Sequence, residues 1–440
     1  MRFSIKRVYR RHPKISIVIV LLIMVLILHN FIIQSPRTNF MEVASWELQG
    51  KSLPGNSTFS YIKTDGIETY LLSAIVRPKM SQNIQIILNS LDFTKGRGAF
   101  LCCLISDKSL IAVPASFHDI HRHFITMPII TQTFYPAPFD ATQYLCGVPE
   151  TDLKNPVTKA TLTLSGSCSH KKEDYLSVVY PKRVSNGLAI CAKVVCGSKL
   201  NIPKLIEWFE MQKLLDVDKI VVFDYKCSSS VQKVFQYYIT EGILEVVPFS
   251  LPGNPERGYD SKNRVYPQFY HDEEITLMDC HERLSGYQYI LVSTVDDILL
   301  PRRHFTIKEL LKSLTESHPK SGGFYFQVQS HVEEWEKESR VTGSYFQQYL
   351  KSTKPTSQFP TYIFIHNRSH SPKQHSFKNV SPYQEHHVEP SLATVHHYGK
   401  CPREWKECVP DEIADKTVIK YKEVVLKNTQ TVLNKLSIRS

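Results

Sequence analysis

Between residues 188 and 252, short apolar runs that read as buried strands alternate with amphipathic segments of helical length. The strand runs are 188–196, 218–225 and 243–252, and the helical segments are 201–215 and 228–242. Asn201 and Ser228 are predicted as the N-caps of the two helices, and Gly242 as the stop of the second. Strands that alternate with such helices form βαβ units. We therefore predict a mostly parallel sheet with the helices as right-handed crossovers.

The stretch 291–301, LVSTVDDILLP, places Asp296 and Asp297 side by side among apolar residues. We predict a late strand of the same sheet, with the acidic pair at its C-terminal end. Ligands of open α/β sheets bind outside the carboxyl ends of the strands. Two adjacent carboxylates are costly to desolvate and therefore need water, a basic partner or a cation. The alternative to a ligand site is a solvated turn or an ion pair with Arg302 or Arg303.

A histidine pair, His396 and His397, ends another predicted strand, SLATVHHY. Aspartate and histidine at the ends of strands suit a divalent cation such as Mn²⁺, whose open positions would take the oxygens of a diphosphate. The alternatives are a structural histidine or a surface turn. A metal-dependent hydrolase is disfavoured, because the dense ligand set of a two-metal site is missing from the sequence.

Four segments, taken together in their order along the chain, resemble glycosyltransferase family 92. They are the segment 211–252, the helix around MDCHER, LVSTVDDILLPR, and TVHHYGKCPREW, and the resemblance covers roughly residues 185 to 410. The family consists of membrane-anchored galactosyltransferases with a GT-A type nucleotide-sugar domain. The resemblance implies a UDP-sugar donor, most simply UDP-galactose, and Mn²⁺-assisted inverting transfer. It also implies a glycan acceptor on a glycoprotein or glycolipid.

One position departs from the family pattern. Where the family shows a D-x-D-E-like segment, this chain has Thr294, Val295, Asp296 and Asp297, and threonine supplies no carboxylate. Asp296 matches the second metal carboxylate, so Asp296 and His397 are assigned to the cation. Asp297 is assigned to donor binding, with a role in supporting the ion or on the acceptor side as the alternatives. The loss at Thr294 leaves two alternatives, a weakened or metal-independent enzyme and a non-catalytic glycan-binding or scaffolding relative.

Inversion also requires a carboxylate that accepts the proton of the acceptor hydroxyl. Glu333 and Glu334, which follow a predicted strand, are the candidates, and a solvated helix start is the alternative for each. Asp224 ends the strand 218–225, and Asp279 lies on the helix before the acidic pair. Both are assigned to donor binding, with a helix cap or a surface position as the alternative.

The N-terminal sequence predicts a membrane anchor. Residues 1–14 carry six basic residues and no acidic one, and residues 15–33 are apolar without a formal charge. A stretch of about 20 such residues spans a bilayer, and the basic flank places the N-terminus in the cytosol. A cleaved signal peptide is the alternative. The remaining expected parts are a stem at 34–70, a small β-rich domain at 71–184, an α/β GT-A-like domain with a mixed sheet at 185–415, and a C-terminal tail at 416–440.

The predicted anchor and stem, together with the family resemblance, imply a single-pass type II protein of the Golgi membrane whose catalytic part is lumenal. Without the six N-terminal basic residues, 47 Lys and Arg face 42 Asp and Glu, which gives little support to nucleic-acid binding. All ten cysteines follow the predicted span, and the even count is compatible with lumenal disulfides. Glycosylation acceptors occur at Asn56, Asn367 and Asn379, the last weakened by Pro382.

Overall fold

The structure of the 440-residue chain is a computed structural model. It describes residues 60–438 apart from several gaps, of which the longest are 118–138 and 250–265. Pro54–Ser440 form one compact unit. The expected cytosolic tail and anchor at 1–33, and most of the stem, lie outside the described residues. Among the helices that are described, none is long and apolar enough to cross a membrane.

Eight strands between residues 60 and 179 form the first sheet. They are β1 (Ser60–Thr64), β2 (Ile67–Arg77), β3 (Asn83–Phe93), β4 (Leu101–Ser106), β5 (Ser109–Phe117), β6 (Phe139–Pro149), β7 (Val157–Thr163) and β8 (Leu176–Val179). Their order is β1-β2-β3-β6-β5-β4-β7-β8, and β8 also pairs with β2 in parallel, so that the sheet closes on itself. Closure leaves fewer unpaired edge strands. The disulfides Cys102–Cys146 and Cys103–Cys168 cross-link this part of the chain.

The second sheet begins at residue 188 and has nine strands. They are β9 (Leu188–Cys196), β10 (Lys219–Tyr225), β11 (Leu244–Pro248), β12 (Tyr289–Val292), β13 (Asp297–Pro301), β14 (Ser321–Val332), β15 (Thr356–Ile365), β18 (Gln384–His387) and β19 (Ala393–Gly399). The order is β11-β10-β9-β12-β15-β14-β19-β13, with β18 beside β14. β9 to β12 are mutually parallel where they pair, which confirms the predicted parallel arrangement. β15 runs antiparallel to β12 and makes the sheet mixed.

Among the described residues, five helices accompany this sheet. They are α4 (Ile202–Leu214), α5 (Ser229–Thr240), α6 (Tyr266–Arg283), α7 (Ile307–Ser317) and α8 (Lys422–Leu436). The predicted caps are confirmed, because Asn201 accepts a hydrogen bond from the Lys204 backbone N–H at 3.0 Å and Ser228 from that of Val231 at 3.5 Å. Gly242, with φ +82°, follows α5 in the left-handed conformation that favours glycine. The described residues also contain a short strand pair, β16 (Ser369–His370) and β17 (Lys378–Asn379). They form short 3₁₀ turns at Phe346–Gln348, His366–Arg368 and Thr417–Tyr421.

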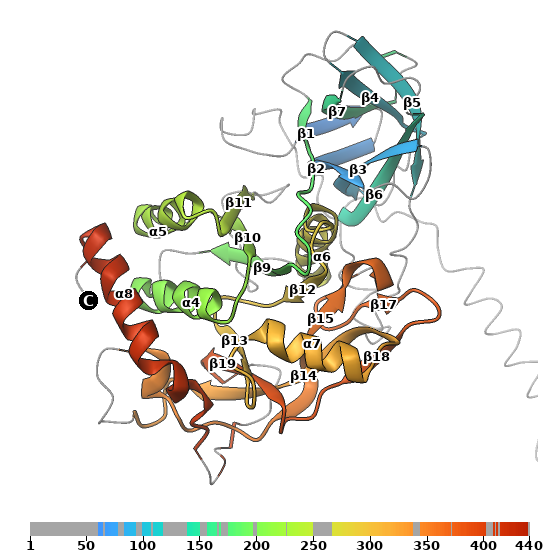
Figure 1. Ribbon diagram of the computed structural model, residues 1–440. Helices are drawn as coiled ribbons and strands as arrows, with labels where there is room; N and C mark the ends of the chain where they lie inside the picture. The colour runs from blue at the N-terminus through green and yellow to red at the C-terminus, as the bar shows by residue number, and fades with distance from the viewer. Residues whose placement is uncertain are drawn as a thin grey trace, which may run out of the picture. The chain divides into compact units, whose positions relative to one another are not determined.

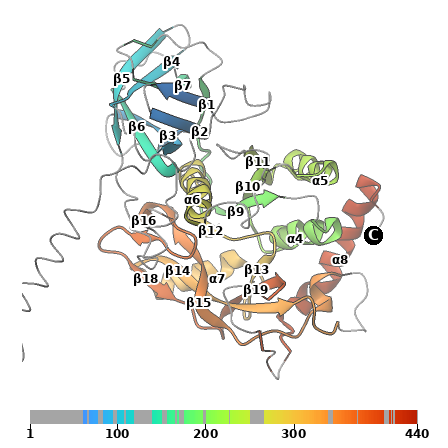
Figure 2. The ribbon, with the colours of Figure 1, turned by 180° about the vertical axis from the view of Figure 1, so that it is seen from behind.

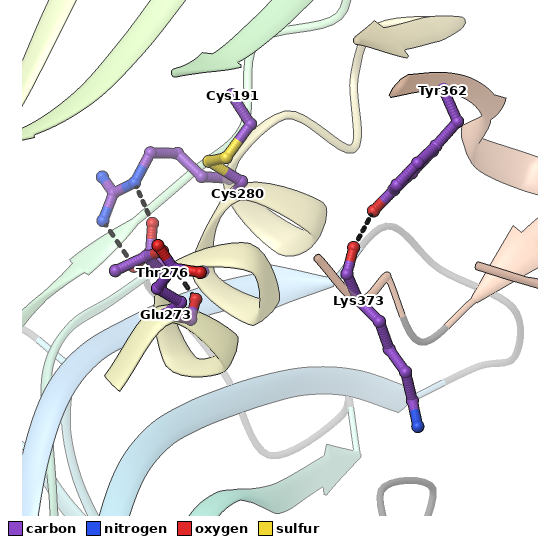
Figure 3. Close-up of a disulfide and its surroundings, with 8 residues drawn as sticks. Cys191, Glu273, Thr276, Cys280, Tyr362 and Lys373 are labelled. Atoms are coloured by element: carbon purple, nitrogen blue, oxygen red, sulfur yellow. Dashed lines mark hydrogen bonds and ion pairs between the residues drawn. A yellow bond between two sulfur atoms is a disulfide. The ribbon is translucent and has the colours of Figure 1, made fainter. Parts of the chain in front are cut away.

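Strand alternation assigns the two faces of the second sheet to different partners. In β9, Leu188 and Ile190 pack with α4, α5 and α8, whereas Ala189 and Cys191 pack with α6 and with apolar side chains of β2, β3 and β6. This follows from the period of two along a strand. Figures 1 and 2 show α4 and α8 next to each other. The disulfide Cys191–Cys280 ties β9 to α6 (Figure 3).

The segment 416–440, expected as a C-terminal tail, contains the helix α8. Its buried residues Val425, Thr429, Val432 and Leu433 follow the i, i+4, i+7, i+8 spacing of one helical face. Val425, Val432 and Leu433 belong to the same apolar cluster as the buried residues of α4. Residues 422–436 are therefore part of the packed α/β structure.

Candidate functional site

The acidic pair lies where the connection from β12 meets β13, with Asp296 as the last residue of the connection. β12 ends at Val292, and Asp297 is the first residue of β13. The Thr294 hydroxyl donates to Asp297 Oδ2 at 2.9 Å, and the Thr294 backbone N–H donates to the same oxygen at 3.2 Å. Local side-chain bonds of this kind compete with continued strand pairing. The pair follows a strand as expected, but it opens the next strand instead of closing the first.

Asp297 forms an ion pair with His397 across β13 and β19. The two residues are direct antiparallel partners, and His397 Nδ1 lies 2.7 Å from Asp297 Oδ1. Burial alone would raise the pKa of Asp297, but the hydrogen bond and charge of His397, with contributions from Thr294 and Lys193, lower it. Burial alone would lower the pKa of His397, but its bond to Asp297 raises it. Each group therefore stabilises the charged form of the other.

Asp296 is paired with a lysine that the sequence analysis missed. Lys204, in the first turn of α4, places its ammonium 2.7 Å from Asp296 Oδ1 and 2.9 Å from Glu333 Oε1. The same ammonium donates to the carbonyl oxygen of Tyr398 at 2.7 Å. Burial would lower the pKa of Lys204, but Asp296 and Glu333 raise it. The sequence position of Lys204 could have indicated it, because α4 follows the carboxyl end of β9, and ligands of open α/β sheets bind at that edge.

Glu333 lies beside Lys204, directly after the end of β14. Its backbone N–H donates to the Gly399 carbonyl at 2.9 Å, which ties it to the end of β19. The Tyr345 hydroxyl and the Lys204 ammonium both donate to Glu333 Oε1. Burial alone would raise the pKa of Glu333, but these two hydrogen bonds lower it. Glu333 is therefore an ionised carboxylate near neutral pH, with 28 % of its side chain exposed.

A buried glutamate positions Tyr345. Glu207, on α4, is only 2 % exposed and accepts hydrogen bonds from the Ser344 hydroxyl at 2.6 Å and from the backbone N–H groups of Tyr345 and Phe346 at 2.6 and 3.1 Å. Burial raises the pKa of Glu207 in spite of these bonds. Glu207 thus holds the segment from which Tyr345 reaches Glu333.

Four of the residues assigned from the sequence therefore come together: Asp296, Asp297, Glu333 and His397. The other three, Glu334, Asp224 and Asp279, make different contacts in the described part of the chain. Glu334 follows Glu333 but is exposed. Asp224 accepts hydrogen bonds from the Cys227 backbone N–H at 2.9 Å and from the Gln232 side chain, so it organises the turn between β10 and α5.

Asp279 is fully buried on α6 and is held by an arginine. Arg283 donates to both of its carboxylate oxygens, at 2.6 and 2.9 Å, and also to Glu245 at 2.8 Å. In the described part of the chain, the side chain of Asp279 bonds to Arg283. It does not bond to the Asp296 cluster, the group formed by Asp296, Asp297, Glu333 and His397. The donor-binding roles of Asp224 and Asp279 stay predictions.

His396 and Arg302 belong to a second, buried polar network. Arg302 pairs with Asp415 at 2.7 Å, and Gln329 donates to the same carboxylate at 2.7 Å. His396, fully buried, lies 3.1 Å from the Gln329 amide nitrogen. The sequence alternative in which Arg302 pairs with the acidic residues is therefore not realised, because Asp415 takes the guanidinium.

The potential metal ligands around Asp296 and His397 are already engaged by other groups of the protein. His397 is bonded to Asp297 through Nδ1, which leaves Nε2 as the nitrogen for a ligand. One oxygen of Asp296, Oδ1, and one of Glu333, Oε1, already face the ammonium of Lys204. Within the residues that the structure describes, no group of three or more His, Cys, Asp or Glu has the geometry to hold a metal. With the Lys204 ammonium between the two carboxylates, this arrangement does not fit a divalent cation as well.

Solved structures resemble this chain only distantly. S. aureus TarS (residues 1–349) is 12 % identical with a TM-score of 0.25, and the match covers 41 % of this chain and 47 % of TarS, about half its length. A putative glucose-1-phosphate thymidylyltransferase from Bacillus anthracis, in complex with a sucrose, is 13 % identical with a TM-score of 0.23, with 41 % and 72 % covered. A UDP-glucose pyrophosphorylase complexed with UDP-glucose is 9 % identical with a TM-score of 0.23, with 57 % and 99 % covered.

The comparison with curated proteins gives no match. The family model of glycosyltransferase family 92, in contrast, matches residues 186–436. The matched region begins just before β9 and ends at the last residue of α8, so it contains the whole second sheet, all five helices and the Asp296 cluster. Because this region is more than half of the 440 residues, the chain belongs to glycosyltransferase family 92.

Proposed function

We propose that this glycosyltransferase transfers a hexose, galactose in the first instance, from UDP-galactose to a glycan hydroxyl on a glycoprotein or glycolipid. The proposal includes a GT-A type donor domain and inversion at the sugar carbon. The observation that carries it is the convergence of Asp296, Asp297, Glu333 and His397 from three separate segments beside the carboxyl end of β12. This is the edge at which open α/β sheets bind their ligands.

Glu333 is proposed as the general base. In the reaction, the acceptor hydroxyl gives its proton to Glu333, its oxygen bonds to the sugar carbon, and the bond from that carbon to the UDP oxygen breaks. A base must be ionised before it can accept this proton, and the hydrogen bonds from Tyr345 and Lys204 favour the ionised form of Glu333. Asp297 and His397 hold the start of β13 beside this carboxylate. Mn²⁺ was expected from the family, but no step here depends on it.

A second candidate function is a glycan-binding or scaffolding relative without catalysis. The specific observation in its favour is that Lys204 bridges Asp296 and Glu333, so both carboxylates already have a partner. The two candidates differ in turnover, since a binding relative would release no UDP from any donor.

A donor screen tests the proposed function. Purified full-length protein is incubated with UDP-galactose, UDP-glucose, UDP-N-acetylglucosamine and GDP-fucose with mixed glycan acceptors, and released nucleotide is measured. We expect UDP release to be fastest with UDP-galactose, because the family resemblance implies a galactose donor. Release that is fastest with another UDP-sugar would correct the sugar, and no release with any donor would favour the binding relative.

The proposal places the chain in the Golgi membrane as a single-pass type II protein with residues beyond the anchor in the lumen. Among the described acceptors, Asn367 is exposed, whereas Asn379 Oδ1 is buried and packs where a Cβ on Gly322 would lie. We expect Asn367→Gln to remove one glycan and Asn379→Gln to remove none, because only an exposed asparagine is modified readily. Gel mobility before and after glycosidase treatment measures this. Unmodified Asn367 in the secretory pathway would contradict the lumenal topology.

A further inference from the structure

Lys204 occupies the place at which a cation would serve this site. Its ammonium is surrounded by three oxygens, from Asp296, Glu333 and the Tyr398 carbonyl, at 2.7 to 2.9 Å. The side chain is only 11 % exposed, and its ammonium also lies 5.1 Å from the centre of the Tyr345 ring. Two carboxylates and a carbonyl are ligands that hard divalent cations use. Here the same ligands hold an ammonium that belongs to the chain.

The site holds three carboxylates, whose negative charge would oppose the binding of an anionic donor. Asp296, Asp297 and Glu333 would together repel a diphosphate if nothing neutralised them. Lys204 compensates the first and the last through direct contacts, and His397 compensates Asp297. All three ammonium hydrogens of Lys204 face oxygens of the protein, so Lys204 acts by neutralising the carboxylates rather than as a phosphate ligand.

Thr294 also disfavours a divalent ion at this site. It stands where a first metal carboxylate would be, and its hydroxyl instead donates to Asp297 at 2.9 Å, so it strengthens the turn that holds the acidic pair. A divalent ion would therefore have one carboxylate fewer than expected and would also have to displace Lys204 from both Asp296 and Glu333.

We propose that Lys204 is a built-in cation of the donor site, and that this enzyme binds the nucleoside diphosphate of its donor without a divalent metal. The inference rests on the proposed function in one respect, the use of a UDP-sugar. Removing the ammonium would leave two uncompensated carboxylates close to the diphosphate, and Coulomb repulsion at such short range weakens binding by at least about tenfold.

The test is calorimetric titration of the full-length protein with UDP, in buffer with EDTA and in buffer with Mn²⁺. We expect the wild-type affinity for UDP to be the same within about twofold in both buffers. Lys204→Met keeps the apolar stem but removes the charge, and it should bind UDP at least about tenfold more weakly in EDTA. If the methionine variant does not fold, Lys204→Gln removes the same charge and keeps a hydrogen-bonding group.

Lys308→Met is the matched control. Lys308 is another part-buried lysine held by two carboxylates, Asp218 at 2.8 Å and Asp216 at 3.4 Å, but these lie before the amino end of β10. Its loss should leave UDP binding unchanged. Wild-type binding that is lost in EDTA and restored by Mn²⁺, or a Lys204→Met affinity equal to wild type, would overturn this inference alone. Wild-type protein that binds no UDP in either buffer would overturn the proposed donor and this inference with it.

Discussion

Replacing Glu333 by glutamine should lower kcat for glycosyl transfer by about 10² to 10⁴, the usual contribution of a general base. The amide keeps the shape of the side chain but cannot accept a proton from the acceptor hydroxyl. Initial rates at saturating donor and acceptor measure this effect. UDP affinity should change much less than kcat, because the proposed role of Glu333 is in the chemical step.

Two neighbouring glutamates make the experiment selective. Glu334→Gln tests the other candidate base, and we expect a rate close to wild type because its side chain is exposed. Glu336→Gln is the matched control, since Glu336 is 81 % exposed and pairs with the exposed Lys351. A large loss in Glu334→Gln with little loss in Glu333→Gln would transfer the role to Glu334.

The pH profile offers a second measurement of the same role. The pKa of Glu333 lies below its usual value, because hydrogen bonds from Tyr345 and Lys204 offset its burial. A base works in its ionised form, so activity is retained as pH falls until Glu333 takes up a proton. We expect the acid limb of the kcat profile below the usual glutamate value of about 4.3. An acid limb near pH 6 to 7 would indicate a different base.

Replacing Arg77 by methionine should destabilise the protein by about 3 to 5 kcal/mol, the usual effect of removing one partner from a buried ion pair. Arg77 is the last residue of β2, and it donates to both oxygens of Glu282, in the last turn of α6, at 2.6 and 3.2 Å. The Glu282 side chain is 1 % exposed, and without Arg77 its ion-pair partner among the described residues would be His281, at 3.2 Å. The free energy of unfolding in urea measures the loss.

The double variant Arg77→Met/Glu282→Gln separates an unpaired buried charge from lost packing. It should be more stable than Arg77→Met alone, because no buried carboxylate is then left without its partner. Lys351→Met, which breaks an exposed pair with Glu336, should cost no more than about 1 kcal/mol. Equal stability of the single and double variants would contradict the assigned role of the pair.

The pH dependence of this effect has a defined sign. Burial alone would raise the pKa of Glu282, but His281 and Arg77 lower it well below its usual range. A carboxylate with a lowered folded pKa adds stability above its unfolded pKa, about 4.3, and this stability is lost as pH falls through the folded value. The deficit of Arg77→Met should therefore be largest between pH 5 and 7 and should shrink in more acidic buffer, where the carboxyl becomes protonated.

Local patterns in the sequence determined much of the α/β structure. The alternation of apolar runs and capped helices from residue 188 predicted β9, α4, β10, α5 and β11, because strand and helix periods and cap residues depend on near neighbours in the chain. The same local information placed the acidic pair after a strand and His397 on another strand, although β19 continues to Gly399 instead of ending at the histidines. The sequence alone therefore named four residues of the cluster.

Only the tertiary structure decided how these residues pair. Asp297 and His397 are 100 positions apart, and Lys204 and Glu333 are 129 apart, so neither contact leaves a local pattern. The sequence assigned Asp296 and His397 to one cation, whereas the fold gives Asp296 to Lys204 and His397 to Asp297. Likewise, the spacing in α8 marks an apolar face, but the packing of α4 against it decides that residues 422–436 belong to the core. Side-chain partners depend on which strand ends and helix turns the fold brings together, and that is a property of the whole packed chain.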